Sequence, residues 1–374
     1  MKIMKINIGF FFFIILVSCS KSKNHGKITF DKDEIKISIT SEYLNSYQVQ
    51  SSFSNEKSLI LIGYNDKRHS LDFFNLGHGE VMKSKKLDYE GPNGIGKIES
   101  LYAHSSDSIF VYELGKLHLL NSDLSISQSW DLFQIYGDLN LGIPQCNFYF
   151  KLYYESNHKS VYFFMNQMGV SPLEIAKLPL MTSLNLETNE VNVLPIYHSE
   201  YFKSVSGQVG FMTYLGFYGK LDNQLIYNYQ YESTMNGFHL DEEKLHETLK
   251  SKLQVVPSIP QTNDPQAYDQ HAIENPHYLS PIPDPWRNLI YSIVWDGPSD
   301  ANSYKTYLDK SQVLRVFNKD LELIQTVPLP DRTYQINNWF VNENGLYLNK
   351  AHPGDTLLKE DNLVFDVYKF QVDS

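Results

Sequence analysis

Three side chains with metal-binding chemistry stand three residues apart in one proline-containing segment. They are His271, Glu274 and His277. Imidazole and carboxylate groups are ligands that metal ions take in proteins. Pro276 interrupts a helix that would carry all three, so the spacing fixes no common face. We therefore expect a solvated loop and no bound metal, and keep these three residues as secondary metal candidates.

An acid and a base follow at the end of the same segment. Asp284 and Arg287 stand three apart, with Trp286 between them, and precede an apolar run that contains Tyr291. Such groups could contact a ligand, or the two charges could pair with each other as a structural clasp. The sequence alone leaves both interpretations open.

Composition excludes several classes of protein. The 374 residues include 32 Lys plus Arg and 43 Asp plus Glu, for a formal net charge of -11. This balance provides no basic face for a nucleic acid. A chain that is 42% hydrophobic and 20% charged is not intrinsically disordered. Two cysteines rule out a disulfide scaffold, and we expect Cys146 to be a buried apolar residue.

The N-terminus has the pattern of a lipoprotein signal peptide. Lys2 and Lys5 precede an apolar run over residues 8–17, which is too short to span a bilayer permanently. The run ends in Leu-Val-Ser-Cys, which predicts lipidation of Cys19 after removal of residues 1–18. Residues 19–26 then form the lipidated Cys and a polar tether, and residues 27–374 a single folded domain. An ordinary secretory signal is the alternative.

One local pattern recurs six times along that domain. Polar residues precede an apolar and aromatic run whose first apolar residue is at 59, 109, 161, 225, 289 and 346, at spacings of 50, 52, 64, 64 and 57. Turn-forming Asn, Asp and Gly follow, as at residues 75–80, 121–123, 185–189 and 318–320. This period is the length of a four-stranded blade and predicts an all-β, six-bladed β-propeller. Seven blades or a large β-sandwich are the alternatives.

The two ends of the domain and one insert complete the predicted arrangement. The segments 27–50 and 363–370 both alternate like strands, so we expect them to pair in one blade and close the ring. Leucines spaced four apart predict a short helix near 241–253, with a charged hairpin as the alternative. The proline-rich stretch 256–285 is interpreted as a long irregular loop.

Two segments resemble a known family. Gly91-Pro92-Asn93-Gly94-Ile95-Gly96, with the strand-like run 107–111 after it, is similar to the inter-blade motif of six-bladed, TolB-like propeller lipoproteins of Bacteroidetes. The segment 284–291 resembles uncharacterised lipoproteins grouped as domain of unknown function 4221. The resemblance implies the fold and the lipid anchor, and implies no activity.

The fold and the candidates together give two functional hypotheses. We favour a non-catalytic, lipid-anchored module that binds an envelope protein, a peptide or a glycan. Its candidate contacts at the channel mouth are Asp284, Trp286, Arg287, Tyr291 and His277. The alternative is a hydrolase or lyase at that mouth, which two carboxylates in contact, or a His paired with one, would favour. We expect no cofactor and no nucleic acid partner.

The sequence also suggests roles for three tryptophans and a location in the cell. Trp286, Trp295 and Trp339 could stack on sugar rings, or pack between blades. The tether lacks an acidic run, which favours the periplasmic face of the outer membrane over the cell surface.

Overall fold

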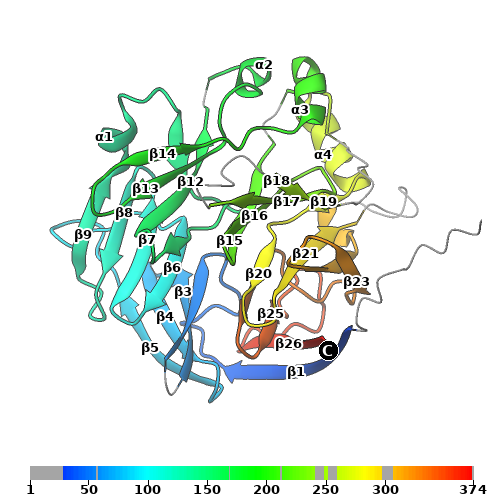
Figure 1. Ribbon diagram of the computed structural model, residues 1–374. Coiled ribbons are helices and arrows are strands. Elements are labelled where there is room, and N and C mark those ends of the chain that lie inside the picture. The colour runs from blue at the N-terminus through cyan, green and yellow to red at the C-terminus, as the bar shows by residue number, and fades with distance from the viewer. Residues whose placement is uncertain are drawn as a thin grey trace, which may run out of the picture.

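The computed structural model describes residues 28–55, 58–167, 169–210, 213–240, 248–251, 259–296 and 306–372. Strands dominate these residues and form six separate antiparallel sheets. The sheets are arranged as the six blades of a β-propeller (Figure 1). The prediction of six blades is therefore confirmed over seven blades or a sandwich.

The first three blades have these strands, from the inner edge outward. Blade 1 comprises β2 (Gln50–Asn55), β3 (Ser58–Asn65), β4 (Ser70–Asn75) and β5 (Glu80–Lys86). Blade 2 comprises β6 (Ser100–Ser105), β7 (Ser108–Glu113), β8 (Lys116–Leu120) and β9 (Ile126–Asp131). Blade 3 comprises β10 (Ile143–Gln145) and β11 (Tyr154–Glu155), which both pair with β12 (Ser160–Asn166), then β13 (Met181–Asn185) and β14 (Val191–Leu194).

The other three blades continue in chain order. Blade 4 comprises β15 (Leu215–Leu221), β16 (Gln224–Tyr229), β17 (Met235–His239) and β18 (Thr248–Lys250). Blade 5 comprises β19 (His277–Tyr278) and β20 (Ile282–Asp284), which both pair with β21 (Leu289–Trp295), then β22 (Gln312–Asn318) and β23 (Leu323–Pro328). Blade 6 comprises β24 (Trp339–Asn342), β25 (Gly345–Asn349), β26 (Asn362–Val372) and β1 (Ile28–Ser38).

The six recurring apolar runs are the second strands of the six blades. They correspond to β3, β7, β12, β16, β21 and β25. A second strand has neighbouring strands on both edges and packs against blades on both faces. Because both faces are buried, its sequence is a continuous apolar run. In β21, for example, all seven residues from Leu289 to Trp295 are buried. The repeat is therefore the signature of the most buried strand.

The predicted turns also lie where hairpins need them. Residues 75–80, 121–123, 185–189 and 318–320 each lie between the third and fourth strands of a blade. Gly79 and Asn189 have φ of 65° and 59° in two of these turns. Glycine and asparagine adopt this left-handed conformation at low cost.

The chain ends close the ring. β1 pairs antiparallel with β26 from Ile28↔Val372 to Ser38↔Asn362, and lies beside it at the lower edge of Figure 1. The predicted pairing of the two ends in one blade is confirmed. The outermost strand of blade 6 thus comes from the N-terminal side and its other three strands from the C-terminal side.

Apolar side chains fill the spaces between adjacent blades. The largest buried cluster spans blades 2, 3 and 4 and includes Phe163, Phe217 and Cys146. Cys146 is 1% exposed, and its burial raises the thiol pKa, so the prediction of a buried apolar residue is confirmed. Hydrogen bonds join the inner strands across blades, since Ser51 Oγ accepts from the Ala103 amide at 2.9 Å.

In the part of the chain that the structure describes, four α-helices lie in the connections, and three of them (α2, α3 and α4) gather toward the upper right of Figure 1. They are α1 (Leu132–Tyr136), α2 (Pro172–Ile175), α3 (Glu200–Val205) and α4 (Pro265–Glu274). The interpretation of 256–285 as irregular throughout is wrong, because α4 lies within it. Asp264 caps its first turn, where Pro265 lacks only an amide that the helix does not use.

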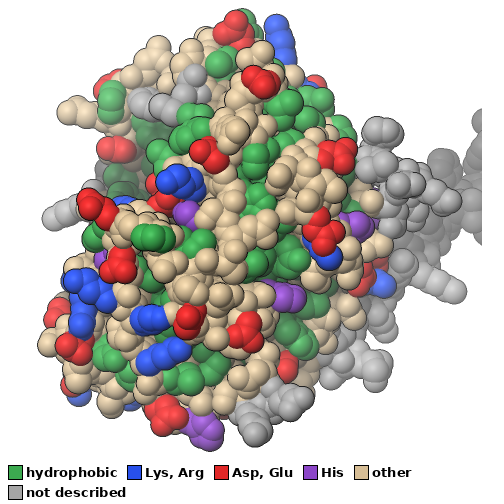
Figure 2. Space-filling model, turned by 90° about the vertical axis from the view of Figure 1, so that its left-hand side faces the viewer, with side chains coloured by type: hydrophobic (Ala, Val, Ile, Leu, Met, Phe, Trp, Pro, Cys, Tyr) green, Lys and Arg blue, Asp and Glu red, His purple; other side chains and the backbone are tan. Residues whose placement is uncertain are grey.

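Some predictions fall on residues outside the described part of the chain. The expected helix near 241–253 overlaps strand β18 (Thr248–Lys250), and residues 241–247 and 252–253 lie outside the described residues. The signal segment and Cys19 lie outside them too. Among the described residues, none of the helices has the length and apolar character needed to cross a bilayer. Acidic and basic side chains are interspersed over the face seen in Figure 2.

Candidate functional site

One cavity receives residues from all six blades and therefore lies on the propeller axis. Its volume is about 250 Å³. The inner strands surround it, with β2 beside β6 and β24, and β20 beside β15 and β24. The residues that line it are Gln50, Ser51, Ser52, Leu101, Tyr102, Lys151, Leu152, Tyr153, Tyr218, Gly219, Lys220, Pro283, Pro285, Trp286, Phe340 and Val341. We refer to it as the channel cavity.

A segment of blade 3 closes one end of the channel. The carbonyl oxygen of Phe148 accepts a hydrogen bond from Asn337 Nδ2, just before the inner strand of blade 6. The carbonyl of Tyr149 accepts from Ser280 Oγ, before the inner strand of blade 5, and from the Phe217 amide at 3.0 Å. Blades 3 and 6 are opposite in a six-bladed ring, so residues 147–149 cross the axis. The channel cavity is therefore blind at this end.

The wall of the cavity is aromatic and hydroxylated. The rings of Tyr102 and Tyr153 meet edge to face at 5.6 Å, and Tyr218 donates its hydroxyl to the carbonyl of Trp339 at 3.3 Å. Burial raises the pKa of Tyr102 to about 12 and raises those of Tyr153 and Tyr218 further. All three hydroxyls are therefore protonated near neutral pH. Trp286, 52% exposed, stands at the open end.

Two lysines line the cavity in different electrostatic settings. Lys220 Nζ lies 2.7 Å from Glu155 Oε1, and the Glu155 side chain is 2% exposed. Burial alone would raise the pKa of Glu155, but the Lys220 ammonium and the amides of His158 and Asn157 together lower it. Burial lowers the pKa of Lys151 to about 8, and its ammonium lies 5.6 Å from the ring centroid of Phe148.

A histidine is paired with the Glu155 carboxylate. His158 Nδ1 lies 2.8 Å from Glu155 Oε2, and the His158 side chain is 63% exposed. Glu155 is not among the residues that line the channel cavity. Its two oxygens are already held by Lys220 and by the backbone and ring of His158. The pair therefore orders the turn between β11 and β12 and offers no free acid or base to the cavity.

Of the five predicted contacts at the channel mouth, Trp286 lines the cavity. Asp284 is fully buried and forms a clasp instead. Its carboxylate accepts from Arg287 Nη1 and from the Tyr291 hydroxyl, both at 2.8 Å. Arg287 also donates to the carbonyls of Asn342 and Glu343, which connects blade 5 to blade 6. The clasp interpretation of Asp284 and Arg287 therefore fits this structure.

The fifth predicted contact, His277, lies in β19, away from the cavity lining, and is 4% exposed. Its ring packs 4.6 Å from that of Tyr231, and burial lowers its pKa to about 3. The other two metal candidates lie on α4, where Glu274 is exposed and accepts from Gln270 Nε2 at 2.6 Å. Within the described ranges, His, Cys, Asp and Glu side chains nowhere form a group of three that could hold a metal ion.

The other tryptophans have structural positions. Trp295 and Trp339 are 7% and 1% exposed and belong to the core between blades 5 and 6. Trp130 is 4% exposed. Trp286 is therefore the one tryptophan of the four that is open to a ligand.

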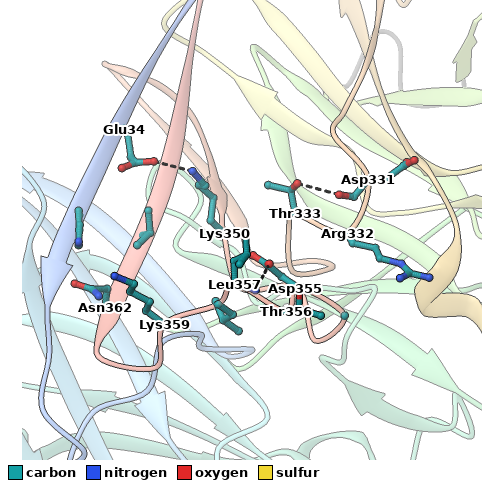
Figure 3. A pocket seen from close by; sticks show the side chains of 14 residues that line it. Glu34, Asp331, Arg332, Thr333, Lys350, Asp355, Thr356, Leu357, Lys359 and Asn362 are labelled. Carbon is teal, nitrogen blue, oxygen red and sulfur yellow. Dashed lines mark hydrogen bonds and ion pairs between the residues drawn. The ribbon is translucent and has the colours of Figure 1, made fainter.

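A wider hollow of about 660 Å³ lies beside blade 6 (Figure 3). Three of its charged side chains are in ion pairs, because Lys350 lies 2.6 Å from Glu34 and Arg332 lies 2.6 Å from Asp309. The hollow is formed by the rim of one blade and the connection before it, and Leu357 on its edge is 84% exposed. We therefore place the candidate site in the channel cavity, which all six blades build.

One described protein family matches this chain over most of its length. The family described as "Domain of unknown function (DUF4221)" matches residues 17–325, which is most of the chain. The chain belongs to the DUF4221 family. This finding agrees with the resemblance noted in segment 284–291. No curated protein matches the sequence.

Solved structures resemble this DUF4221 protein over nearly its whole length. A DUF4221 member from Bacteroides vulgatus has 16% identity and a TM-score of 0.76, covering 93% of this chain and 100% of its own. A putative exported protein from Bacteroides fragilis has 9% identity and a TM-score of 0.55, covering 92% and 96%. At these identities the likeness shows the fold alone.

The sequence interpretation missed most residues of the cavity in this DUF4221 protein. A usable signal existed. Ser52, Tyr102 and Tyr218 stand seven residues before the first apolar residue of the following second strand, and Tyr153 stands eight before it. Each inner strand thus precedes the recurring run by a short hairpin. Alignment of the six repeats on that run would have brought these positions together.

Proposed function

We propose that this protein is a lipid-anchored binding protein of the cell envelope that holds a small, single-ring ligand such as a sugar in its channel cavity. One observation carries the proposal: a blind cavity on the axis combines aromatic rings, hydroxyl groups and a half-exposed tryptophan. About 250 Å³ lies below the 300–1,000 Å³ typical of drug-sized ligands, which favours one ring. Aromatic faces with polar groups beside them suit the two faces of such a ring.

Binding is favoured over hydrolysis because no carboxyl or imidazole group is among the described residues that line the cavity. Hydrolysis in this cavity would need a carboxyl or imidazole group within reach of the substrate. Among the described residues that line the cavity, the ionisable side chains are lysines and tyrosines. Glu155 lies behind Lys220 and is held by it. The arrangement therefore supports recognition rather than general acid–base chemistry.

Intrinsic fluorescence tests the ligand proposal directly, because Trp286 is the exposed tryptophan. Purified full-length protein would be titrated with a panel of neutral, acidic and amino monosaccharides. We expect at least one to change the emission in a saturable manner. Tyr153→Phe, which removes one hydroxyl from the cavity, should weaken binding about tenfold, or about 1.4 kcal/mol. Tyr89→Phe, at a site 62% exposed and outside the cavity, is the matched control. Equal effects of the two variants would refute the assignment of the site.

The anchor is tested separately in cells. Cys19→Ala should abolish incorporation of labelled fatty acid and release the protein from the membrane fraction. Several acyl chains give firm anchoring, because each buried methylene contributes about 0.8 kcal/mol. A Cys19→Ala protein that stays in washed membranes would disprove the anchor. Fractionation of the wild type then tests the proposed location at the periplasmic face of the outer membrane.

A further inference from the structure

The side chains of the channel cavity are unusual for this protein in their charge. The whole chain has 43 acidic and 32 basic residues. Yet among the described residues that line the cavity there are two lysines and no carboxylate. An acidic protein that encloses only cations at its axis has a local potential opposite to its net charge. Such a site attracts anions, because an enclosed, low-dielectric wall strengthens the interaction.

Of the two lysines, Lys220 is already matched. Its ammonium lies 2.7 Å from the buried carboxylate of Glu155, so this pair adds no net charge. Lys151 has no carboxylate within ion-pair distance among the described residues. Its ammonium instead lies over the face of Phe148, in the segment that closes the channel. The closed end of the cavity therefore carries one unmatched positive charge.

Neutral groups that can donate hydrogen bonds line the same cavity. In the described part of the chain, Gln50 Nε2 is buried without a hydrogen-bond partner, and the hydroxyl-bearing Tyr102 and Tyr153 also line the cavity. An unpaired buried donor costs free energy that an acceptor on a ligand would recover. A carboxylate accepts several hydrogen bonds and complements a cation at the same time.

We propose that the channel cavity binds a single-ring compound with one carboxylate, which pairs with Lys151 at the closed end while the ring lies toward Trp286. This inference rests on the proposed function and names the ligand class of the same site. Lys151 acts here as a specificity-determining residue. A neutral ring of the same size would leave its charge unmatched and should bind more weakly.

Two matched pairs of probes test the inference by calorimetry at pH 7: D-glucose with D-glucuronate, and benzyl alcohol with benzoate. The wild type should bind the acid of at least one pair at least tenfold more tightly than its neutral partner. Lys151→Met should remove that preference, because methionine keeps the apolar stem and loses the charge. Lys86→Met removes an exposed positive charge from β5 and should leave the preference unchanged. Lys151→Arg, which keeps the positive charge, should retain at least part of the preference for the acid.

The outcomes separate the inference from the proposed function. If neutral and acidic partners bind equally well, the anionic ligand is ruled out while the binding function stands. If no member of either pair changes the heat signal or the tryptophan emission, the anionic ligand and the proposed binding function are both rejected. A preference that survives in Lys151→Met, with the far-ultraviolet circular dichroism spectrum of the wild type, assigns the anion to another group and overturns the role of Lys151.

Discussion

At the residue scale, several buried ionisable groups in the described part of the chain are either matched by a partner of opposite charge or neutral. Asp284 is the clearest matched case, since its carboxylate is fully buried and holds Arg287 and Tyr291. Such a pair gives limited net stability, because both charges lose their hydration. Removing one partner is costly, because the other is left buried without compensation.

Asp284→Ala should therefore reduce the free energy of unfolding by about 3–5 kcal/mol. Glu42→Ala is the control, since the Glu42–Arg68 pair is exposed on both sides and contributes about 0–1 kcal/mol. Urea titrations of both variants and the wild type measure the difference. Two variants of equal stability would show that Asp284 has no clasp role.

Neutralisation is the other solution, and it is found at His198 and His277. Burial lowers the pKa of each to about 3, so both are neutral in the folded protein. The unfolded chain takes up these protons near pH 6.5. Below that pH the unfolded state binds more protons, so stability falls as the pH drops from about 6.5 toward 3.

His277→Phe should make this acid destabilisation weaker. At pH 4.5, two units below the unfolded pKa, one such histidine costs about 2.7 kcal/mol. If the variant is less stable at pH 7, its free energy of unfolding should thus approach or exceed that of the wild type at pH 4.5. Urea unfolding at the two pH values measures this difference. His78→Phe, at an exposed turn, should leave the pH profile unchanged. Parallel profiles for wild type and His277→Phe would contradict the prediction.

At the scale of elements, helix α4 depends on a lysine from blade 5. Lys310 is 2% exposed, and its ammonium donates to the carbonyls of Ala272, at 2.7 Å, and Asn275. These carbonyls lie at the C-terminal end of α4, where helical hydrogen bonds run out and a positive charge is favourable. One buried cation therefore fastens the helix to the blade.

Lys310→Met should loosen the last turn of α4 without unfolding the propeller. We expect amide hydrogen exchange over residues 270–275 to accelerate about tenfold, which corresponds to about 1.4 kcal/mol. Lys319→Met removes an exposed lysine from the hairpin between β22 and β23 and serves as the control. Unchanged exchange in α4 of Lys310→Met would mean that other contacts hold the helix.

At the scale of the whole molecule, stability depends on closing the ring. β1 is the outermost strand of blade 6 and pairs with β26 along eleven residues. Ile37 in this strand is fully buried. An open ring would leave the edge of β26 unpaired and available to other chains.

A chain that begins at residue 40 should lose cooperative thermal unfolding and self-associate, whereas one that begins at residue 27 should melt as a single transition. Differential scanning calorimetry and light scattering measure both properties. A monomeric, cooperatively melting chain from residue 40 would show that the pairing of β1 with β26 is dispensable.

In the full chain, Ile37→Ala should lower the free energy of unfolding by about 2–5 kcal/mol. Thr29→Ala, on the exposed side of β1, should lower it little.

Several features of this protein were determined by the sequence alone. The six runs that begin at 59, 109, 161, 225, 289 and 346 mark six second strands, and Asn- and Gly-rich turns mark the outer hairpins. These signals are local, because burial on both faces and positive φ are imposed within a few residues. Alternation at both ends also indicated the ring closure.

The candidate site was decided only by the tertiary structure. Tyr102, Tyr153 and Tyr218 are separated by 51 and 65 residues, and they meet because each inner strand returns to one axis. The segment that closes the channel is fixed by Asn337, 189 residues away from Phe148. The sequence left open whether Asp284 faces a ligand or pairs with Arg287. The structure decides for the pair, because carbonyls of blade 6 hold Arg287 in place. Periodicity specifies which strands are buried, but the side chains that share a cavity depend on how six distant repeats close into a ring.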